Sequence, residues 1–288
     1  MLFESACEMY MADKEKRLRA NTLEGYRSAI RRHLLPMWGG REIESIGGEE
    51  LQEWVDGFEL AGAAEKAFKT FRQVFRWCVR KKGLRAWDAT VAVELPRKRP
   101  KRRRALTAEQ EKRFLKSIMG EPFERVAIAI ISLGLRPSEG AGLDDADIDY
   151  RSGWVDIDRG AHSVKGGMVE YPCKSEHSHR RLKLPRWALA RLRSLRKGRG
   201  RLRGDLSPRQ VYAAIKRALV RAGMGWASVA CFRHSWATLA LEAGAAIEDI
   251  AVSLGHTSTD TCKRHYLMTT GAVVARAQTA YARAMGVS

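Results

Sequence analysis

Gly134-Leu-Arg-Pro-Ser-Glu139 marks a change of direction between two predicted helices in the second half of this chain. It follows the apolar segment 123–135, which is predicted to be a helix that ends near Gly134. A second helix is predicted beyond it, so Arg136 lies at a junction between two helices. An arginine beside a proline is commonplace by itself, and its significance depends on the sequence around it.

A strongly basic segment precedes this junction and divides the chain. Seven of the nine residues from Pro96 to Arg104 are lysine or arginine, and the other two are prolines. Because proline blocks a continuing helix and like charges repel each other, the segment is predicted to be extended. We interpret residues 96–105 as a linker that lies along DNA phosphates, with a simple solvated linker as the alternative. Its cationic residues are Arg97, Lys98, Arg99, Lys101, Arg102, Arg103 and Arg104.

Residues 1–95 are predicted to form a small all-helical domain. Hydrophobic periodicity indicates helices over 21–35, 49–60 and 63–82, with Asn21 capping the first. In the third helix, Phe68, Phe71 and Phe75 form one stripe that we predict to face the core. Cations on its other faces suit a helix that lies on DNA, whereas a solvated face is the alternative. These cations are Lys66, Lys69, Arg72, Arg76 and Arg80.

Residues 106–288 combine helices with a small antiparallel sheet. Thr107-Ala-Glu-Gln110 and Ser207-Pro-Arg-Gln210 are typical helix starts. Alternating apolar and polar residues predict strands over 154–158, 168–173 and 181–184, with a turn at Gly166-Gly167. Helices are predicted to resume at Pro185 and to include 231–243, 247–254 and 272–285. The predicted fold class is therefore mainly α with a small antiparallel β-sheet.

Net charge narrows the classes of partner. The chain has 288 residues with 52 Lys+Arg against 33 Asp+Glu, a net charge of +19. This favours a polyanionic partner, with nucleic acid as the leading candidate and an anionic membrane surface as the weaker one. No run of 18 apolar residues occurs, and the N-terminus lacks a signal-peptide pattern. Five cysteines without a CxxC motif argue against a disulfide framework, so a cytoplasmic location is predicted.

Residues that could cut a phosphodiester occur in the second half of the chain. Without a metal, the reaction needs a nucleophile, cations that hold the non-bridging oxygens, and a proton donor for the leaving oxygen. The planar fork of arginine matches two phosphate oxygens. After Arg136, candidates follow in Cys231-Phe-Arg-His-Ser-Trp-Ala-Thr238, in Leu254-Gly-His256 and at Tyr266. Each of these motifs is weak evidence by itself. Their order along the chain is what supports a phosphodiester-cutting site.

In this order the segments resemble the tyrosine recombinases, also called phage integrases. The catalytic domain of that family reads Gly-Leu-Arg-x-x-Glu, a strand-borne Lys, His-x-x-Arg-His, Leu-Gly-His and Tyr. The match spans roughly residues 105–270. The resemblance implies a helical core-binding domain at 1–95 and an α-rich catalytic domain at 106–288 with a C-terminal helix.

Four matching residues would act on the scissile phosphate. The resemblance implies that Tyr266 attacks it to form a 3′-phosphotyrosine, while Arg136 and Arg233 clamp its non-bridging oxygens. His256 would donate a further hydrogen bond. No cofactor and no metal are implied, since the phosphotyrosine link stores the energy of the broken bond.

Further residues would assist this reaction. The family's spacing of Lys before Arg-x-x-x-Leu-Pro assigns the general acid for the leaving 5′ oxygen to Lys174, with Lys165 and Lys183 as rivals. Glu139 and His234 would support the site without reacting.

One position departs from the family's pattern. The family has His, or sometimes Lys, three residues before the second arginine, and this chain has Ala230. Alanine can neither accept a proton from Tyr266 nor bond the phosphate, and a lost general acid–base costs about 10²–10⁴ in rate. We expect cleavage that is slowed but not abolished. A natural weak variant, an engineered substitution and compensation by a neighbour such as His234 are the open explanations.

Two other clusters contain side chains that could bind a metal. Cys173, His177 and His179 have suitable side chains for zinc, but their segment is better interpreted as a polar hairpin turn. The carboxylates of 144–149 lack the glycine and the final glutamate of a calcium loop, so a solvated loop is predicted.

The resemblance thus implies a site-specific DNA recombinase, bacterial or phage-encoded, that integrates or excises a phage or other mobile element. Its expected partners are double-stranded DNA, its own copies in a homotetramer on paired sites, and accessory DNA-bending proteins. A catalytically impaired relative that regulates by binding DNA is one alternative, which Ala230 favours. A monomeric topoisomerase-like enzyme with the same chemistry is the other.

Overall fold

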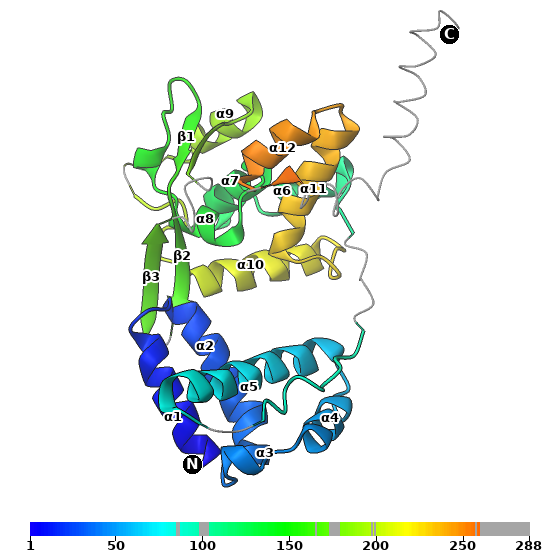
Figure 1. Cartoon of the computed structure of the whole chain (residues 1–288). Helices are drawn as coiled ribbons and strands as arrows, with labels where there is room; N and C mark the ends of the chain where they lie inside the picture. Colours follow the sequence, from blue (N-terminus) through cyan, green and yellow to red (C-terminus); the bar gives the residue numbers. More distant parts are fainter. Residues whose placement is uncertain are drawn as a thin grey trace, which may run out of the picture. The chain divides into compact units, whose positions relative to one another are not determined.

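The computed structural model describes residues 1–84, 87–97, 104–164, 166–172, 179–196, 198, 200–256 and 258–259. The chain divides into two compact units, Met1–Lys101 and Arg102–Ser288, each of which is described by itself (Figure 1). The predicted fold class is confirmed, since the architecture is mainly helical with short antiparallel strands. Over the described ranges, no helix is long and apolar enough to cross a membrane.

The first unit consists of helices. Its third and longest predicted helix corresponds to α5, whose side chains Phe68, Phe71 and Phe75 are at most 1% exposed, which confirms the predicted core stripe. The Phe71 ring stacks 4.9 Å from that of Phe3, so α5 packs on α1. The elements are α1 (Phe3–Glu15), α2 (Ala20–Ala29), the π-helical η1 (Ile30–Leu34), α3 (Leu35–Trp38), the 3₁₀ turn η2 (Ile43–Ser45), α4 (Gly48–Asp56) and α5 (Ala61–Lys82).

The start and the end of α2 differ from the prediction. The last extended residue is Arg19, so Asn21 lies inside the helix and the predicted cap is wrong. Pro36 does not end the helical segment either, because η1 continues directly into α3. Pro36 lies in the first turn of α3, directly after the π-helical turn η1.

The second unit is built around the apolar helix α7. Leu133 is 3% exposed and Ile130 fully buried, and α7 packs against α6, α8, α9 and α11 (Figure 1). The predicted caps are confirmed: Thr107 Oγ1 accepts from the Gln110 amide at 3.2 Å and Ser207 Oγ from the Gln210 amide at 3.3 Å. The helices are α6 (Ala108–Ser117), α7 (Glu124–Leu133), α8 (Pro137–Gly142), η3 (Asp145–Asp147), α9 (Arg186–Ser194), α10 (Pro208–Arg221), α11 (Val229–Glu242) and α12 (Ile247–Leu254).

The strands form two separate ribbons instead of the single sheet that the sequence suggested. Strands β1 (Trp154–Ile157) and β4 (Arg180–Lys183) pair antiparallel, with Ile157 opposite Arg180. Strands β2 (Arg159–Val164) and β3 (Gly167–Pro172) form a hairpin of their own. The prediction missed β2 because Arg-Gly-Ala-His-Ser-Val does not alternate between apolar and polar residues.

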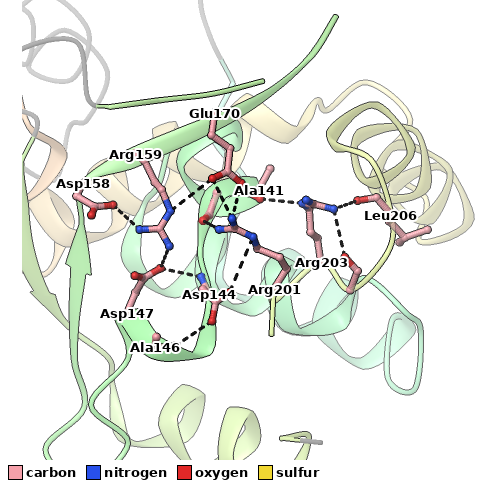
Figure 2. Close-up of polar contacts among 12 residues, drawn as sticks. Ala141, Asp144, Ala146, Asp147, Asp158, Arg159, Glu170, Arg201, Arg203 and Leu206 are labelled. Atoms are coloured by element: carbon pink, nitrogen blue, oxygen red, sulfur yellow. Dashed lines mark hydrogen bonds and ion pairs between the residues drawn. The ribbon is translucent and has the colours of Figure 1, made fainter. Parts of the chain in front are cut away.

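An ion-pair network fastens the β2–β3 hairpin to neighbouring loops (Figure 2). Arg159 of β2 donates to Asp147 and Asp158 at 2.7 Å each, and Arg201 donates to Glu170 of β3 at 2.9 Å. Asp145 is also buried and pairs with Arg125. The predicted solvated loop at 144–149 is therefore only partly correct: Asp149 is exposed, whereas Asp145 is buried, and three of the four aspartates pair with arginines.

Glu111 of α6 is expected to make the stability of the second unit depend on pH. Burial raises its pKa from 4.5 to about 8, and no hydrogen-bond partner is found for Oε1 among the described residues. A raised pKa in the folded state means that stability is full below pH 4.5 and is lost as the pH rises toward 8. Glu111→Gln should therefore raise the melting temperature near pH 8, and the gain should shrink at lower pH.

Thermal unfolding across this pH range measures the effect. Glu109→Gln is the control, because Glu109 lies two residues away and its backbone hydrogen bond lowers the pKa of its carboxyl. A gain near pH 8 from the control variant, or none from Glu111→Gln, would contradict the assignment.

Candidate active site

The turn from α7 to α8 places Arg136 in a fixed position. Gly134 ends α7 with φ at +61°, a left-handed conformation that glycine adopts without steric cost. Pro137 then opens α8, where its missing amide hydrogen costs nothing. Glu139 reaches back, and its Oε2 accepts from the Arg136 amide at 2.9 Å. The motif Gly-Leu-Arg-Pro-Ser-Glu is thus a helix end, a turn and a capped helix start.

Gly134 also allows α11 to pack closely against the end of α7. A Cβ at this position would lie 2.9 Å from ring carbons of Trp236. The indole Nε1 of Trp236 donates to the Ser132 carbonyl at 3.1 Å, which holds the ring in place. Arg233, on the same helix, donates through Nη1 to the Gly134 carbonyl at 3.1 Å. The first arginine motif is therefore fixed directly against the second.

Gly134→Ala is expected to destabilise the second unit by more than its backbone conformation alone explains. The left-handed conformation costs alanine about 1–2 kcal/mol, and the clash with Trp236 adds to that. Gly223→Ala is the matched control in the same unit: φ is +75° there, and the nearest atom is a flexible Arg113 nitrogen at 3.9 Å. Denaturant unfolding should give a larger loss for Gly134→Ala, and equal losses would contradict the contact.

The side chain of Arg233 connects α11 with the end of α12. It is only 12% exposed. Its Nη2 donates to the Leu254 carbonyl at 2.5 Å and lies 3.0 Å from Nε2 of His256. Gly255 ends α12 with φ at +64°, and the His256 amide bonds back to the Ala251 carbonyl at 3.0 Å. The Leu-Gly-His motif is a helix C-cap that presents the histidine to the second arginine.

Glu139 lies at the centre of this cluster. Its side chain is 5% exposed and accepts from Arg136 Nη1 at 2.7 Å and from Arg180 Nη2 at 2.9 Å, and Arg233 Nη1 lies 3.9 Å away. Burial would raise the pKa of Glu139, but hydrogen bonds and charges from Arg180 and Arg136 outweigh it and lower that pKa. Glu139 is therefore an anion that gathers three arginines.

Three arginines also hold three successive backbone carbonyls at the end of α12. Arg180 Nε donates to Ser253 O at 2.7 Å, Arg233 Nη2 to Leu254 O at 2.5 Å, and Arg136 Nη2 to Gly255 O at 3.4 Å. The last carbonyls of a helix lack partners within the helix and carry partial negative charge. The arginines satisfy them and fix the chain immediately before His256.

Other site residues predicted from the sequence flank this cluster. Ala230 is exposed in the first turn of α11, three residues before Arg233 and so on the same helix face. His234 is 5% exposed within the unit. The end of the basic linker is anchored nearby: the Arg104 guanidinium lies 4.4 Å over the Trp226 ring, and the Leu106 amide donates to Ser235 Oγ at 2.7 Å.

Several predicted site residues lie outside the described residues. These are Tyr266, Lys174, the rival Lys165, the linker residues Lys98, Arg99, Lys101, Arg102 and Arg103, and the predicted helix 272–285. The other rival, Lys183, is exposed on β4, with its Nζ 5.4 Å from the centre of the Trp154 ring.

The cations of the first unit carry partners of their own. Lys69 pairs with Glu65 at 2.5 Å, Arg76 pairs with Asp88 at 3.0 Å, and the Arg72 guanidinium lies 5.8 Å over the Phe68 ring. Arg97 is exposed. A groove of about 420 Å³ runs between α2 and α5, and Asn21, Thr22, Lys66 and Lys69 contribute to its lining. These cations are thus accessible, and two of them are partly neutralised.

Comparison with known proteins supplies the family. The profile of the phage integrase family matches residues 104–271, more than half of the chain, and that of the phage integrase N-terminal SAM-like domain matches residues 2–58. The chain belongs to the phage integrase family. Tyrosine recombinase XerA of Thermococcus kodakarensis is 28% identical over 257 residues, which cover 84% of this chain and 82% of XerA.

Solved integrases share the fold of this family member. The Tn1549 transposon integrase, in complex with transposon right end DNA, has a TM-score of 0.75 at 18% identity and covers 96% of this chain and 98% of its own. A lambda integrase dimer bound to a core site has a TM-score of 0.69 at 19% identity, covering 91% and 97%.

Arg180 is the residue of this integrase site that sequence reasoning missed. It entered only as a marker for the spacing after Lys174. Alternation along β4 could have found it, because Arg180 shares a strand face with Leu182 and Leu184, which pack inward. A charged residue at an inward position needs a buried partner, and Glu139 is that partner.

Proposed function

We propose that this integrase is a site-specific DNA recombinase that cuts and rejoins DNA through a 3′-phosphotyrosine at Tyr266. The observation that carries the proposal is the convergence of Arg136, Arg233 and His256, which come from three separate motifs, around the buried Glu139. Two guanidinium groups and an imidazole so close together form a site for a dianionic transition state.

In the proposed reaction, the Tyr266 oxygen attacks phosphorus, the bond to the 5′ oxygen breaks, and the proton lost by Tyr266 passes to a base or to solvent. Lys174 gives a proton to the leaving 5′ oxygen. A phenol has an ordinary pKa of about 10, so nearby cations must favour its ionised form, which Arg136 and Arg233 can do. Attack by the freed 5′ hydroxyl reverses the step and rejoins the strand.

We assign the remaining charge to duplex DNA. The cations of α5 and the linker would neutralise phosphates away from the cut, without reading sequence. The similarity to a transposon integrase with right end DNA and to a lambda integrase dimer on a core site supports DNA as the partner. Integration or excision of a mobile element by a tetramer on paired sites, in the cytoplasm, completes the proposal. DNA-bending proteins would be its accessory partners.

A nicked duplex tests this function directly. A duplex that the full chain selects from a random-sequence library is prepared with a nick beside each possible scissile bond, so that the short 5′-ended product diffuses away. We expect a protein–DNA adduct that survives a denaturing gel and maps to Tyr266, with Tyr266→Phe as the control. Tight binding without an adduct would overturn the recombinase assignment.

A DNA-binding regulator is the second candidate, and one observation favours it. Ala230 places a methyl group, which cannot take the proton of Tyr266, at an exposed position in the first turn of α11. Such a protein would occupy its sites without cutting. The same nicked duplex separates the two functions, since a regulator binds it and forms no adduct even on long incubation.

A further inference from the structure

We propose that Arg180 is a positioning residue that keeps Arg136, Arg233 and His256 in the arrangement needed to receive one phosphate. The inference rests on the proposed recombinase function and adds a residue to it. Arg180 contacts two parts of the site at once, the carboxylate of Glu139 and the backbone at the end of α12.

Burial shows that Arg180 acts through other residues. Its side chain is 5% exposed, whereas that of Arg136 is 39% exposed. A guanidinium this deeply enclosed faces protein groups, and its contacts are with protein: Nη2 and Nη1 to Glu139 at 2.9 and 3.2 Å, and Nε to the Ser253 carbonyl at 2.7 Å. Arg180 is therefore placed to orient the groups that would touch DNA.

The two contacts of Arg180 control two different neighbours. Glu139 also binds Arg136, and with Arg180 removed this buried carboxylate would attract Arg136 and Arg233 more strongly and draw them away from a substrate. Ser253 is the first of the three carbonyls that the arginines hold, and His256 follows them directly. Loss of Arg180 would thus shift both the arginine clamp and the histidine.

Lysine cannot replace this arrangement. The rigid fork of arginine makes two parallel bonds to Glu139 and uses its third nitrogen, Nε, for Ser253. A lysine ammonium is a single point charge on a flexible stem and can occupy only one of these places well. Arg180→Lys therefore keeps the charge and removes the geometry, which makes it the informative variant.

Arg191→Lys is the matched control. Arg191 also makes two bonds to an almost fully buried glutamate, Glu124, at 2.7 and 3.2 Å, in the same unit. Strand cleavage is measured in a single turnover at saturating selected duplex. We expect Arg180→Lys to cleave about 10²-fold more slowly, the scale of an ångström-sized misplacement, with DNA affinity retained. Arg191→Lys should cleave at the wild-type rate.

A methylphosphonate at the scissile position separates positioning from general damage. It carries a methyl group in place of one non-bridging oxygen, so the reaction depends less on the arginine clamp. The defect of Arg180→Lys should become smaller on this substrate, whereas a damaged fold would slow both substrates equally. Glu139→Gln, which weakens the same contacts without changing shape, should show the same pattern and serves if the lysine variant does not fold.

The outcomes are distinct. If the wild-type chain cleaves, two results for Arg180→Lys overturn the role of Arg180: an unchanged cleavage rate, or equal losses of rate on the phosphate and methylphosphonate substrates. Either result leaves the recombinase function standing. Absence of cleavage by the wild-type chain on every nicked duplex overturns the recombinase function, and the role of Arg180 with it.

Discussion

Arg233→Ala is expected to slow strand cleavage by about 10³-fold, the upper range for removal of one preorganised donor from a transition-state site. We expect this large loss of rate because the Arg233 side chain makes several contacts within the site. Arg233 bonds the carbonyls of Gly134 and Leu254 and lies 3.0 Å from the His256 imidazole. Its removal takes away a cation and also releases two neighbouring motifs.

Single-turnover cleavage of the selected duplex, beside a binding titration, measures this effect. The affinity for DNA should fall little, because many phosphates outside the site contribute to binding. Arg233→Lys should lose nearly as much as Arg233→Ala, since one ammonium cannot reach two carbonyls and a phosphate. A cleavage rate for Arg233→Ala within a factor of about 10 of the wild type would mean less than about 1.4 kcal/mol of transition-state stabilisation and would remove Arg233 from the site.

The parts of the site that are determined locally can be predicted from the sequence. Arg136 and Glu139 belong to one helix start, where the three-residue spacing by itself brings the carboxylate back to the arginine amide. Gly255 and His256 form a helix end, which a glycine after an apolar run also predicts. Such features need no knowledge of the rest of the chain.

Features that depend on tertiary packing were not predictable in the same way. Arg180 meets Glu139 only because β4 pairs with β1 and brings a residue 41 positions away to α8. The separate β2–β3 hairpin was missed for a related reason, since ion pairs of Arg159 and Arg201 hold it in place of an alternating apolar face. Alternation along a strand can mark a residue such as Arg180 as facing inward, but it does not identify the distant residue with which the charge pairs.

The predicted helix caps include two that are correct and one that is wrong. Thr107 and Ser207 were predicted correctly because each has a glutamine three residues later that closes the cap. Asn21 has a glutamate three residues later as well, yet α2 begins at Ala20. Leu23 packs inward, and extending the helix by two residues costs little when a buried residue follows. Packing of the apolar face therefore overrode the local preference of asparagine.

Ala230→His is expected to accelerate strand cleavage by about 10²-fold or more, because it supplies a general acid–base at a position where alanine cannot act as one. Ala230 is exposed in the first turn of α11, so a larger side chain can be accommodated without overpacking the core. It precedes Arg233 by three residues, so the two side chains lie on one face of α11, and Arg233 in turn contacts His256.

The pH dependence identifies the source of any gain. The introduced imidazole must be neutral to accept a proton from Tyr266, so the rate of Ala230→His should rise with pH through about 6.5. Ala230→Gln is the control, as its side chain is of similar size but does not titrate, and it should neither accelerate cleavage nor add this dependence. No gain from histidine in a chain that already cleaves would mean that a neighbour replaces the missing group. If both the wild-type chain and Ala230→His bind the nicked duplex tightly and neither forms an adduct, the DNA-binding regulator is favoured. Restoring the proton acceptor would then not restore the reaction.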